Sequence, residues 1–399
     1  MAPWSSSPQV DVHIKFDVED RSELTLHAPT YVGDEYITGT ATFSSVKKHE
    51  SSRYKIAVKG IVQTKTTELP AGGLQSTLSI ETHTFLCATL FEGLVPASLH
   101  DDKRYMAQVP FKFSLANSHD CSSDSSRSLD HASRQYLPSI DSKTAGRHWS
   151  NTFKTGPDAK YSVTYTIIAT VMSDRRRVFS ASRPFSYLPS THDPVRLALE
   201  DFPEEYVVRT TKAIKSSSTS LSRIGIISQE PHALLLHRNV NGGETDVNLC
   251  LMLLRDGTTS FGKDSLPRQA RIRAELRTTT IVATRAGTPA AHTLPGALKS
   301  RAVIKQEKSN AQEYRVTLNQ WHCPDSESEE DQRMTTTSEE VLTNSLAMSF
   351  RIAGSPYLPP AFHSPLLSRR YAIDLALTFD DDNSTVVSLR LPVLIGYKT

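Results

Sequence analysis

The chain has 399 residues, with 45 Lys and Arg against 43 Asp and Glu, and a formal net charge of +2 at pH 7. This length predicts two domains of the usual ~100 to 200 residues. The balanced charge gives no general reason to expect nucleic-acid binding. Apolar residues then alternate with polar ones in segment after segment, a period of two that is typical of strands with one buried face.

In chain order, the alternating segments predict half-buried antiparallel strands, and helical spacing is scarce. Turn residues separate these short strands, and no helical segments alternate with them, which favours β-sandwiches over a parallel α/β sheet. In the first half, the segments are Val12–Val18, Tyr54–Val62, Val109–Leu115 and Tyr161–Val171, and a first sandwich is expected to close near Phe185–Pro189. In the second half, they are Ile272–Leu276, Tyr371–Phe379 and Val387–Ile395.

An internal repeat supports two copies of one domain type. Each half has Tyr-Leu-Pro, then a gap, a Tyr-led alternating strand and a last strand that carries a proline. The first copy starts at Tyr136 and the second at Tyr357. We therefore predict an all-β protein of two tandem immunoglobulin-like sandwiches at residues 9–190 and 225–397, with a linker at 191–224. Three polar segments, 117–134, 215–223 and 324–340, are predicted to be mobile loops that proteases cut first.

Four cysteines, Cys87, Cys121, Cys250 and Cys323, form no Cys-x-x-Cys pair, which favours a reducing compartment. Residues 1–8 lack the features of a signal peptide, and the uncharged segment 161–173 is shorter than the ~20 apolar residues of a spanning helix. The chain carries none of the usual catalytic motifs, such as Gly-x-Ser-x-Gly, His-Glu-x-x-His or a phosphate-binding glycine loop. We expect a protein that is not an enzyme and binds no cofactor, metal or small-molecule substrate.

The order of these motifs resembles the arrestin-like family, and its α-arrestin branch in particular. The resemblance rests on Tyr54–Gly60, Val109–Leu115, Tyr161–Val171, Arg183–Pro189 and the stretch from Leu358 to Tyr371. It implies two tandem sandwiches, no cofactor, and a cytoplasmic adaptor, peripheral at the plasma membrane or endosomes, that binds cytoplasmic tails of membrane proteins in endocytosis or sorting. The alternative is a constitutive structural subunit of a coat or retromer-like complex with the same fold.

Many α-arrestins recruit a ubiquitin ligase through Pro-Pro-x-Tyr, which this chain lacks, so recruitment is expected to be indirect. The nearest match is Ala28-Pro29-Thr30-Tyr31. Because it lies between two expected strands, we predict that Tyr31 packs inside the sandwich and cannot fill a WW-domain groove.

Two polar clusters are candidate sites. Arg175, Arg176 and Arg177, with Arg183 near them, could bind phosphorylated peptides or an anionic membrane surface, because guanidinium groups donate paired hydrogen bonds; a charged hairpin tip is the alternative. Ser326 and Ser328 precede carboxylates and form a candidate phosphorylation loop, against a merely soluble insertion.

Three other clusters favour structural roles. His322 and Cys323 are adjacent in a predicted strand end and point to opposite faces, so they are expected to bind no metal. Asp380–Asn383 predicts a solvated hairpin and not a calcium loop. Arg370 and Asp374 are predicted to lie on the outward face of one strand and to offset each other's charge; Arg369-Arg370 could otherwise bind anions.

Overall fold

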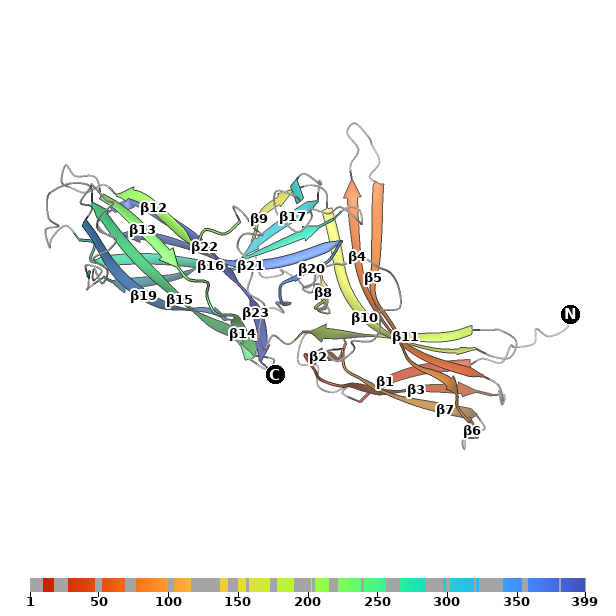
Figure 1. Cartoon of the computed structure of the whole chain (residues 1–399). Helices are drawn as coiled ribbons and strands as arrows, with labels where there is room; N and C mark the ends of the chain where they lie inside the picture. The colour runs from red at the N-terminus through yellow and green to blue at the C-terminus, as the bar shows by residue number, and fades with distance from the viewer. Residues whose placement is uncertain are drawn as a thin grey trace, which may run out of the picture.

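The computed structural model describes residues 10–17, 28–46, 52–68, 77–99, 104–115, 137–142, 150–155, 158–172, 178–189, 202, 205–214, 222–237, 240–255, 266–283, 297–298, 302–318, 321–322, 340–353, 358–379 and 382–398. These residues form strands β1 to β23 in four sheets, and the predicted all-β class is confirmed (Figure 1). Within the described part of the chain, no helix is long and apolar enough to cross a membrane.

The first two sheets come almost entirely from the first half of the chain. The first sheet has the order β1 (Val10–Phe16), β3 (Ile37–Ser45), β7 (Tyr105–Phe113), β6 (Ser98–Leu99). The second sheet has the order β2 (Thr30–Val32), β11 (Val178–Leu188), β10 (Asp158–Met172), β4 (Arg53–Glu68), β5 (Thr77–Leu94), with β8 (Ile140–Asp141) beside β10.

The other two sheets come mainly from the second half. The third sheet has the order β12 (Arg209–Ile214), β13 (Ser222–Ser228), β15 (Val240–Arg255), β14 (Leu234–His237), β23 (Ile395–Lys398), with β19 (Glu340–Ala353) beside β15. The fourth has the order β20 (Phe362–His363), β21 (Leu367–Phe379), β16 (Gln269–Val282), β17 (Val303–Lys308), β9 (Ser150–Thr155), with β18 (Gln312–Thr317) beside β16 and β22 (Asp382–Val393) beside β21.

Two separate apolar clusters fill the space between the sheets. The first cluster gathers the inward residues of the first and second sheets, and an aromatic group forms its centre: the Phe16 ring lies 6.2 Å from that of Tyr31, 6.0 Å from Phe111 and 6.1 Å from Phe185. The second cluster gathers the inward residues of the third and fourth sheets. Burial of each large side chain contributes about 1.5 to 3 kcal/mol, so the alternation in the sequence places most of the stabilising surface in these clusters.

The internal repeat of the sequence is also present in the hydrogen bonds. The Tyr165 hydroxyl donates to the Leu137 carbonyl at 2.6 Å, and the Tyr371 hydroxyl donates to the Pro359 carbonyl at 2.6 Å. A two-residue strand follows each Leu-Pro and pairs with the Tyr-led strand: β8 with β10, and β20 with β21. The last strand of each half pairs in parallel with an earlier one, β11 with β2 and β23 with β14.

Several strands extend beyond the expected boundaries. β12 lies inside the 191–224 segment that was expected to be a linker, and it is an edge strand of the third sheet. Ser222 and Arg223 begin β13, and Glu340 begins β19, although the sequence placed all three in polar loops. These polar residues can extend the strands because strand pairing uses backbone N–H and C=O groups and does not require apolar side chains. The rest of the three polar segments lies outside the described residues.

Candidate functional site

The two halves meet through shared secondary structure and not only through side chains. β9 belongs to the first half by sequence, yet it pairs antiparallel with β17 at the edge of the fourth sheet (Figure 1). The first apolar cluster also includes second-half residues, among them Ile281, Val282, Ile304 and Leu367. The halves are therefore joined into one body by a strand pairing and a shared apolar cluster, here called the joint.

Arg369 is the largest fully buried side chain of the joint, at 1% exposure. Its guanidinium donates to the Tyr371 hydroxyl at 2.9 Å, to Thr280 Oγ1 at 3.0 Å and to the Tyr161 hydroxyl at 3.4 Å. Because Tyr161 belongs to β10 and the other two partners to the fourth sheet, Arg369 ties the halves together. Burial lowers the pKa of Arg369, but Tyr371, Tyr161 and the buried Glu307 outweigh it and raise the pKa, so the group stays charged.

Glu307, a buried residue of β17, supplies the negative charge that acts on Arg369. Lys305 Nζ lies 2.6 Å from Glu307 Oε1, while Glu307 Oε2 and Thr278 Oγ1 have no hydrogen-bond partner among the described residues. A buried charge is strongly destabilising unless it is paired. The joint therefore depends on the balance of Arg369 and Lys305 against Glu307.

On the opposite face of the fourth sheet, Arg370 of β21 has a different position from the one predicted. Arg370 was predicted to lie outward and to pair with Asp374, but its side chain is buried, with Glu205 Oε2 at 2.5 Å and the Phe202 ring at 5.1 Å. Glu205, itself buried, covers this part of the sheet. The prediction was wrong because alternation along one strand cannot show that a distant segment covers its outer face. Arg369-Arg370 is thus held by internal partners.

Asp374 is the centre of a different ion-pair network. Arg277 Nε donates to Asp374 Oδ2 at 2.7 Å, Arg390 Nε donates to Oδ1 at 3.0 Å, and Lys308 Nζ lies 3.1 Å from Oδ2. Burial alone raises the pKa of Asp374, but the hydrogen bonds and charges of these cations outweigh it, and the pKa lies below its usual range.

Of the predicted anion-binding residues, only Arg183 lies within the described part. Its guanidinium donates to the Ile14 carbonyl at 2.6 Å and lies over the Phe16 ring at 5.5 Å, so it connects β11 to β1. Arg183 lies five positions after Val178, the first residue of β11, which is ~17 Å along an extended strand at ~3.3 Å per residue. Arg175, Arg176 and Arg177 lie outside the described residues, as do Ser326, Ser328, Cys323, Asp380 and Asp381.

Tyr31 has the buried position that the sequence predicts, and the prediction for His322 holds in part. Tyr31 is buried in the aromatic group and pairs with Tyr187 across the parallel ladder, which confirms its packing inside the sandwich. His322 is exposed and forms an isolated bridge with Thr343, while Trp321 packs against the second cluster. Within the described ranges, no group of three His, Cys, Asp or Glu residues could hold a metal ion.

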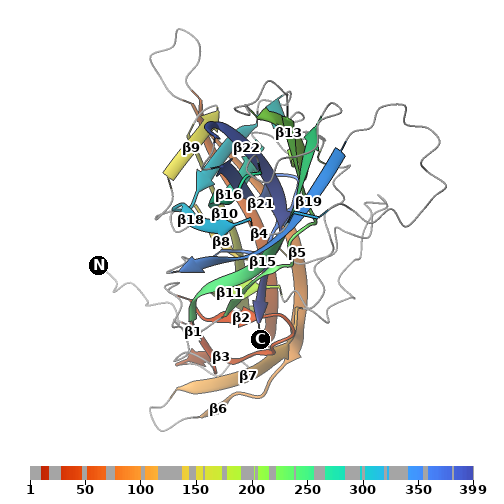
Figure 2. The same ribbon diagram turned by 90° about the vertical axis from the view of Figure 1, so that its left-hand side faces the viewer.

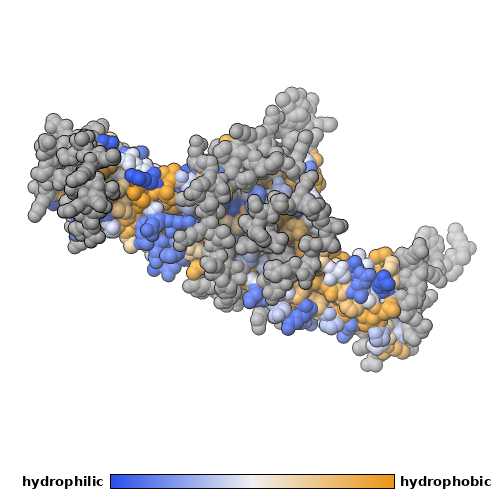
Figure 3. Space-filling model, viewed as in Figure 1, coloured by the Kyte–Doolittle hydropathy of each residue, from blue (hydrophilic) through white to orange (hydrophobic). Residues whose placement is uncertain are grey.

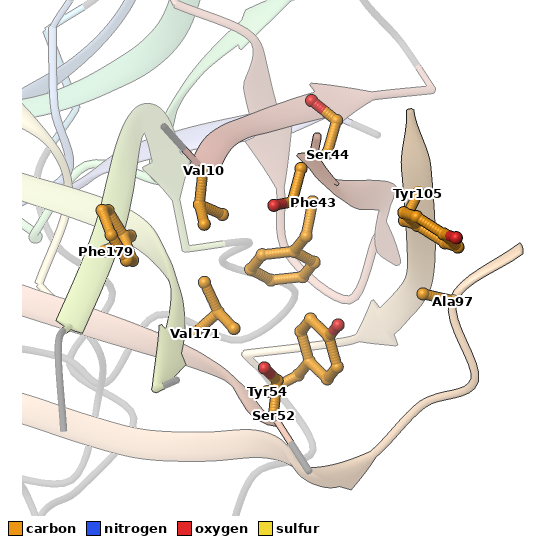
Figure 4. A pocket seen from close by; sticks show the side chains of 10 residues that line it. Val10, Phe43, Ser44, Ser52, Tyr54, Ala97, Tyr105, Val171 and Phe179 are labelled. Atoms are coloured by element: carbon orange, nitrogen blue, oxygen red, sulfur yellow. The ribbon is translucent and has the colours of Figure 1, made fainter. Parts of the chain in front are cut away.

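A small cavity lies between the first and second sheets. It has a volume of about 20 Å³ and lies between Val10, Phe43, Tyr54, Val171 and Phe179 (Figure 4). A space of this size holds about one water molecule. A much larger, open groove of about 670 Å³ lies between β18 of the fourth sheet and β19 of the third.

Two sheet edges face each other at this groove. Among the described strands, β19 pairs with β15 and β18 pairs with β16, and the other edge of β19 is bridged only at Thr343, by His322. The Tyr314 hydroxyl donates to the Ser349 carbonyl at 3.0 Å, and the Gln312 side-chain amide bonds to the backbone of Arg351. Figure 2 shows the C-terminal end of β19 approaching β18 at this point.

Fold and site together define an all-β protein of four sheets around two apolar clusters, with a buried ionic joint and an open groove between sheet edges. Neither a protein-family model nor a curated protein matches the chain.

Proposed function

We propose that the chain is an arrestin-like adaptor, in which two tandem sandwiches, residues 9–190 and 225–397, bind cytoplasmic segments of membrane proteins during endocytosis or sorting. The observation that carries this proposal is the presence of two long strands that lie at sheet edges in the described part of the chain. β5 spans 18 residues and β19 spans 14 residues, and each is an edge strand. Natural proteins usually shorten, charge or cover such edges, because an open edge pairs with any extended chain.

Extended peptides are a common type of ligand for an exposed sheet edge. Main-chain hydrogen bonds give affinity, and alternate side chains give specificity. The repeated architecture, with its matching Tyr-to-carbonyl bonds and parallel pairs, also agrees with the two-copy organisation that the family resemblance implies. Among the coloured residues of the face shown in Figure 3, hydrophilic and hydrophobic ones are interspersed, which suits small local contacts.

Affinity purification combined with proximity labelling in intact cells tests this proposal. An adaptor should recover a changing, substoichiometric set of proteins enriched in receptors and transporters. A fixed set at near-equal amounts would instead support the alternative, a constitutive subunit of a coat or retromer-like complex. We propose a cytoplasmic location, peripheral at the plasma membrane or endosomes, which the same labelling measures.

We also propose that Arg175, Arg176 and Arg177 form an anion-binding point. Replacement of all three by Ser should weaken binding to anionic vesicles and phosphorylated peptides, with the greatest effect at low salt, because screening shortens the reach of exposed charges to ~8 Å near physiological ionic strength. Unchanged binding would show that these residues form only a solvated turn.

A further inference from the structure

The two open edges differ in regularity. In the pairing of β5 with β4 the register shifts twice, and Phe85 and Leu90 are left without partners, so β5 carries two bulges. Bulges bend and twist an edge, and proteins use them to prevent pairing with another chain. The pairing of β19 with β15 runs without a shift from Glu340 to Ala353. Of the two edges, β19 is the one whose geometry accepts a further strand.

The direction of the backbone groups of β19 follows from its contacts. Thr343 exchanges backbone hydrogen bonds with His322 at 2.8 and 2.9 Å, the Ser349 carbonyl accepts from Tyr314, and Arg351 bonds to Gln312. Outward-facing groups therefore belong to the odd-numbered residues of this strand, because the two edges of a strand alternate along an antiparallel pair. Ser345 and Ala347 have the same parity, so their N–H and C=O groups point to the open edge.

Among the described residues, contacts at both ends leave an open window in the middle of this edge. His322 closes the edge at Thr343, and Tyr314 and Gln312 close it from Ser349 to Arg351. Between Thr343 and Ser349 the strand advances by six residues, or ~20 Å at ~3.4 Å per residue. No described strand pairs with the edge at Ser345 or Ala347. The window is long enough for an extended segment of about five residues.

The groove beside this window is open to solvent and has a lining of apolar, polar and charged residues. Its volume of about 670 Å³ falls within the range of ~300 to 1,000 Å³ that is usual for ligand sites. Tyr314, Val316 and Met348 give it apolar surface, and Arg315 and Arg351 give it charge.

The charges of the groove favour an acidic ligand. Arg315 lies directly opposite Arg271 in the ladder, both side chains are exposed, and neither has an ion-pair partner among the described residues. Like charges in directly opposite positions are destabilising, and a bound anion removes that repulsion. Glu313 is the single acidic residue of the lining, and it faces Arg273 across the ladder. The ion pair of Arg351 with Glu244, at 3.0 Å, is exposed, so salt and water weaken it.

We propose that the groove between β18 and β19 binds an extended peptide with acidic side chains, which adds as a strand to the edge of β19 at Ser345 and Ala347. Backbone groups of the window give affinity, and Arg315 and Arg351, which line the groove, select negative charge. The inference rests on the proposed adaptor function and specifies where and in what form a cytoplasmic segment binds.

Fluorescence anisotropy of a labelled probe peptide, Gly-Ser-Val-Glu-Val-Glu-Val-Ser-Gly, against the purified full-length chain tests the site. Ala347→Pro removes the outward N–H without removing a bond to β15, a substitution that edge strands tolerate. It should weaken probe binding at least tenfold. Ala347→Ser keeps the N–H at the same position and should change binding by less than about twofold.

The charge requirement has an independent test that does not alter the backbone. Arg315→Glu should weaken binding of the probe at least tenfold at low salt, and a probe with Lys in place of Glu should bind the wild type more weakly by a similar factor. Arg53→Glu is the control, because Arg53 is an exposed arginine on the second sheet that pairs with Glu92. It should leave probe binding unchanged.

Hydrogen exchange locates the bound peptide: saturating probe should slow exchange at Ser345 and Ala347. Absence of probe binding would overturn the proposal, and so would unchanged affinity in folded Ala347→Pro and Arg315→Glu variants. The adaptor function and the groove can fail separately. If cells show that membrane proteins are captured equally by wild type and Ala347→Pro, the groove is wrong and the function stands. If the probe binds at β19 but only a fixed set of partners is recovered, the function is wrong and the groove stands.

Discussion

Arg369 and Arg370 are neighbours in β21, yet each is buried on a different side of the fourth sheet. Successive side chains of a strand point to opposite faces, so one guanidinium enters the joint and the other reaches Glu205. Each buried charge is stable only with its own partners, and loss of one partner destabilises such a site by about 3 to 5 kcal/mol. A pair of adjacent arginines that resembles an exposed anion-binding motif therefore has a structural role at both positions.

The burial of Tyr31 decides whether this side chain packs inside the fold or is available to recruit a ubiquitin ligase. Its exposed fraction is 3%, and its ring lies 6.0 Å from that of Phe185. Tyr31→Ala should lower the free energy of unfolding by about 3 to 5 kcal/mol, as is usual for a buried aromatic residue, in a urea titration. Tyr36→Ala, at 54% exposure, is the matched control and should change stability by less than about 1 kcal/mol.

The same two variants test the ubiquitin-ligase question. Labelled WW domains should bind neither wild type nor variants, because a buried tyrosine cannot also fill an aromatic groove. Micromolar binding that is lost in Tyr31→Ala, with an unchanged melting temperature, would contradict this expectation and indicate direct recruitment.

The lowered pKa of Asp374 should make the free energy of unfolding depend on pH under acidic conditions. Its pKa in the folded protein is lowered, so its contribution is fully present above the unfolded value of about 3.9 and is lost as the pH falls through the lower, folded value. Asp374→Asn should reduce the free energy of unfolding by about 1.5 to 3 kcal/mol at pH 7, in keeping with hydrogen bonds to charged groups.

The difference between wild type and Asp374→Asn should narrow as the pH falls below about 4, which urea titrations from pH 7 to pH 2.5 would show. Asp246→Asn, an exposed residue of β15, should give a curve parallel to the wild type. A gap that stays constant down to pH 2.5 would mean that Asp374 stabilises the fold by packing and not through its charge.

At the scale of the strand, Gly39 is the position in β3 where a side chain cannot fit. A Cβ there would lie 2.3 Å from the Lys15 carbonyl and 2.5 Å from Cζ of Phe111, so the Phe111 ring occupies the space above the glycine. Gly39→Ala should destabilise the protein by about 1 to 3 kcal/mol, as overpacking usually does. Gly225→Ala is the control, because its nearest contact is the flexible Met252 side chain at 3.1 Å; equal losses of stability in both variants would contradict this account.

Strands with strict alternation could be predicted from the sequence, and irregular ones could not. Tyr161–Val171 and Tyr371–Phe379 lie within β10 and β21 as expected. β5 was missed because its bulges at Phe85 and Leu90 break the period of two. β19 was missed although Leu342, Leu346, Met348, Phe350 and Ile352 alternate with polar residues, because Asn344 interrupts the apolar face.

The candidate groove had no sequence signal that could have revealed it. An open edge is a property of which strands pair, and Gln312, Tyr314 and Arg315 are ordinary strand residues when read along the chain. The joint was hidden for the same reason, since Tyr161 and Arg369 are 208 residues apart. Periodicity shows which face of a strand is buried, but it does not show what covers that face.

At the scale of the whole molecule, the joint predicts that the halves depend on each other. Separately expressed fragments 1–190 and 191–399 should each be poorly soluble, because the first fragment loses Ile281, Ile304 and Leu367 from its apolar cluster and β9 loses its partner β17. Co-expressed fragments should elute as one 1:1 complex in size-exclusion chromatography, and the intact chain should melt in one cooperative transition. Two stable, β-rich fragments that do not associate would show that the joint is dispensable.

The parallel pair of β14 with β23 has a consequence for synthesis of the protein. Leu234 pairs with Ile395, and at ~5 to 20 residues per second a ribosome needs about 8 to 30 s to advance from one to the other. During that interval the second cluster lacks Ile395 and Tyr397, and the nascent third sheet exposes apolar surface. Such distant pairings also slow folding, because the loop must close before the contact forms. The chain should therefore depend on chaperones during translation, and most strongly in the seconds before its last strand emerges.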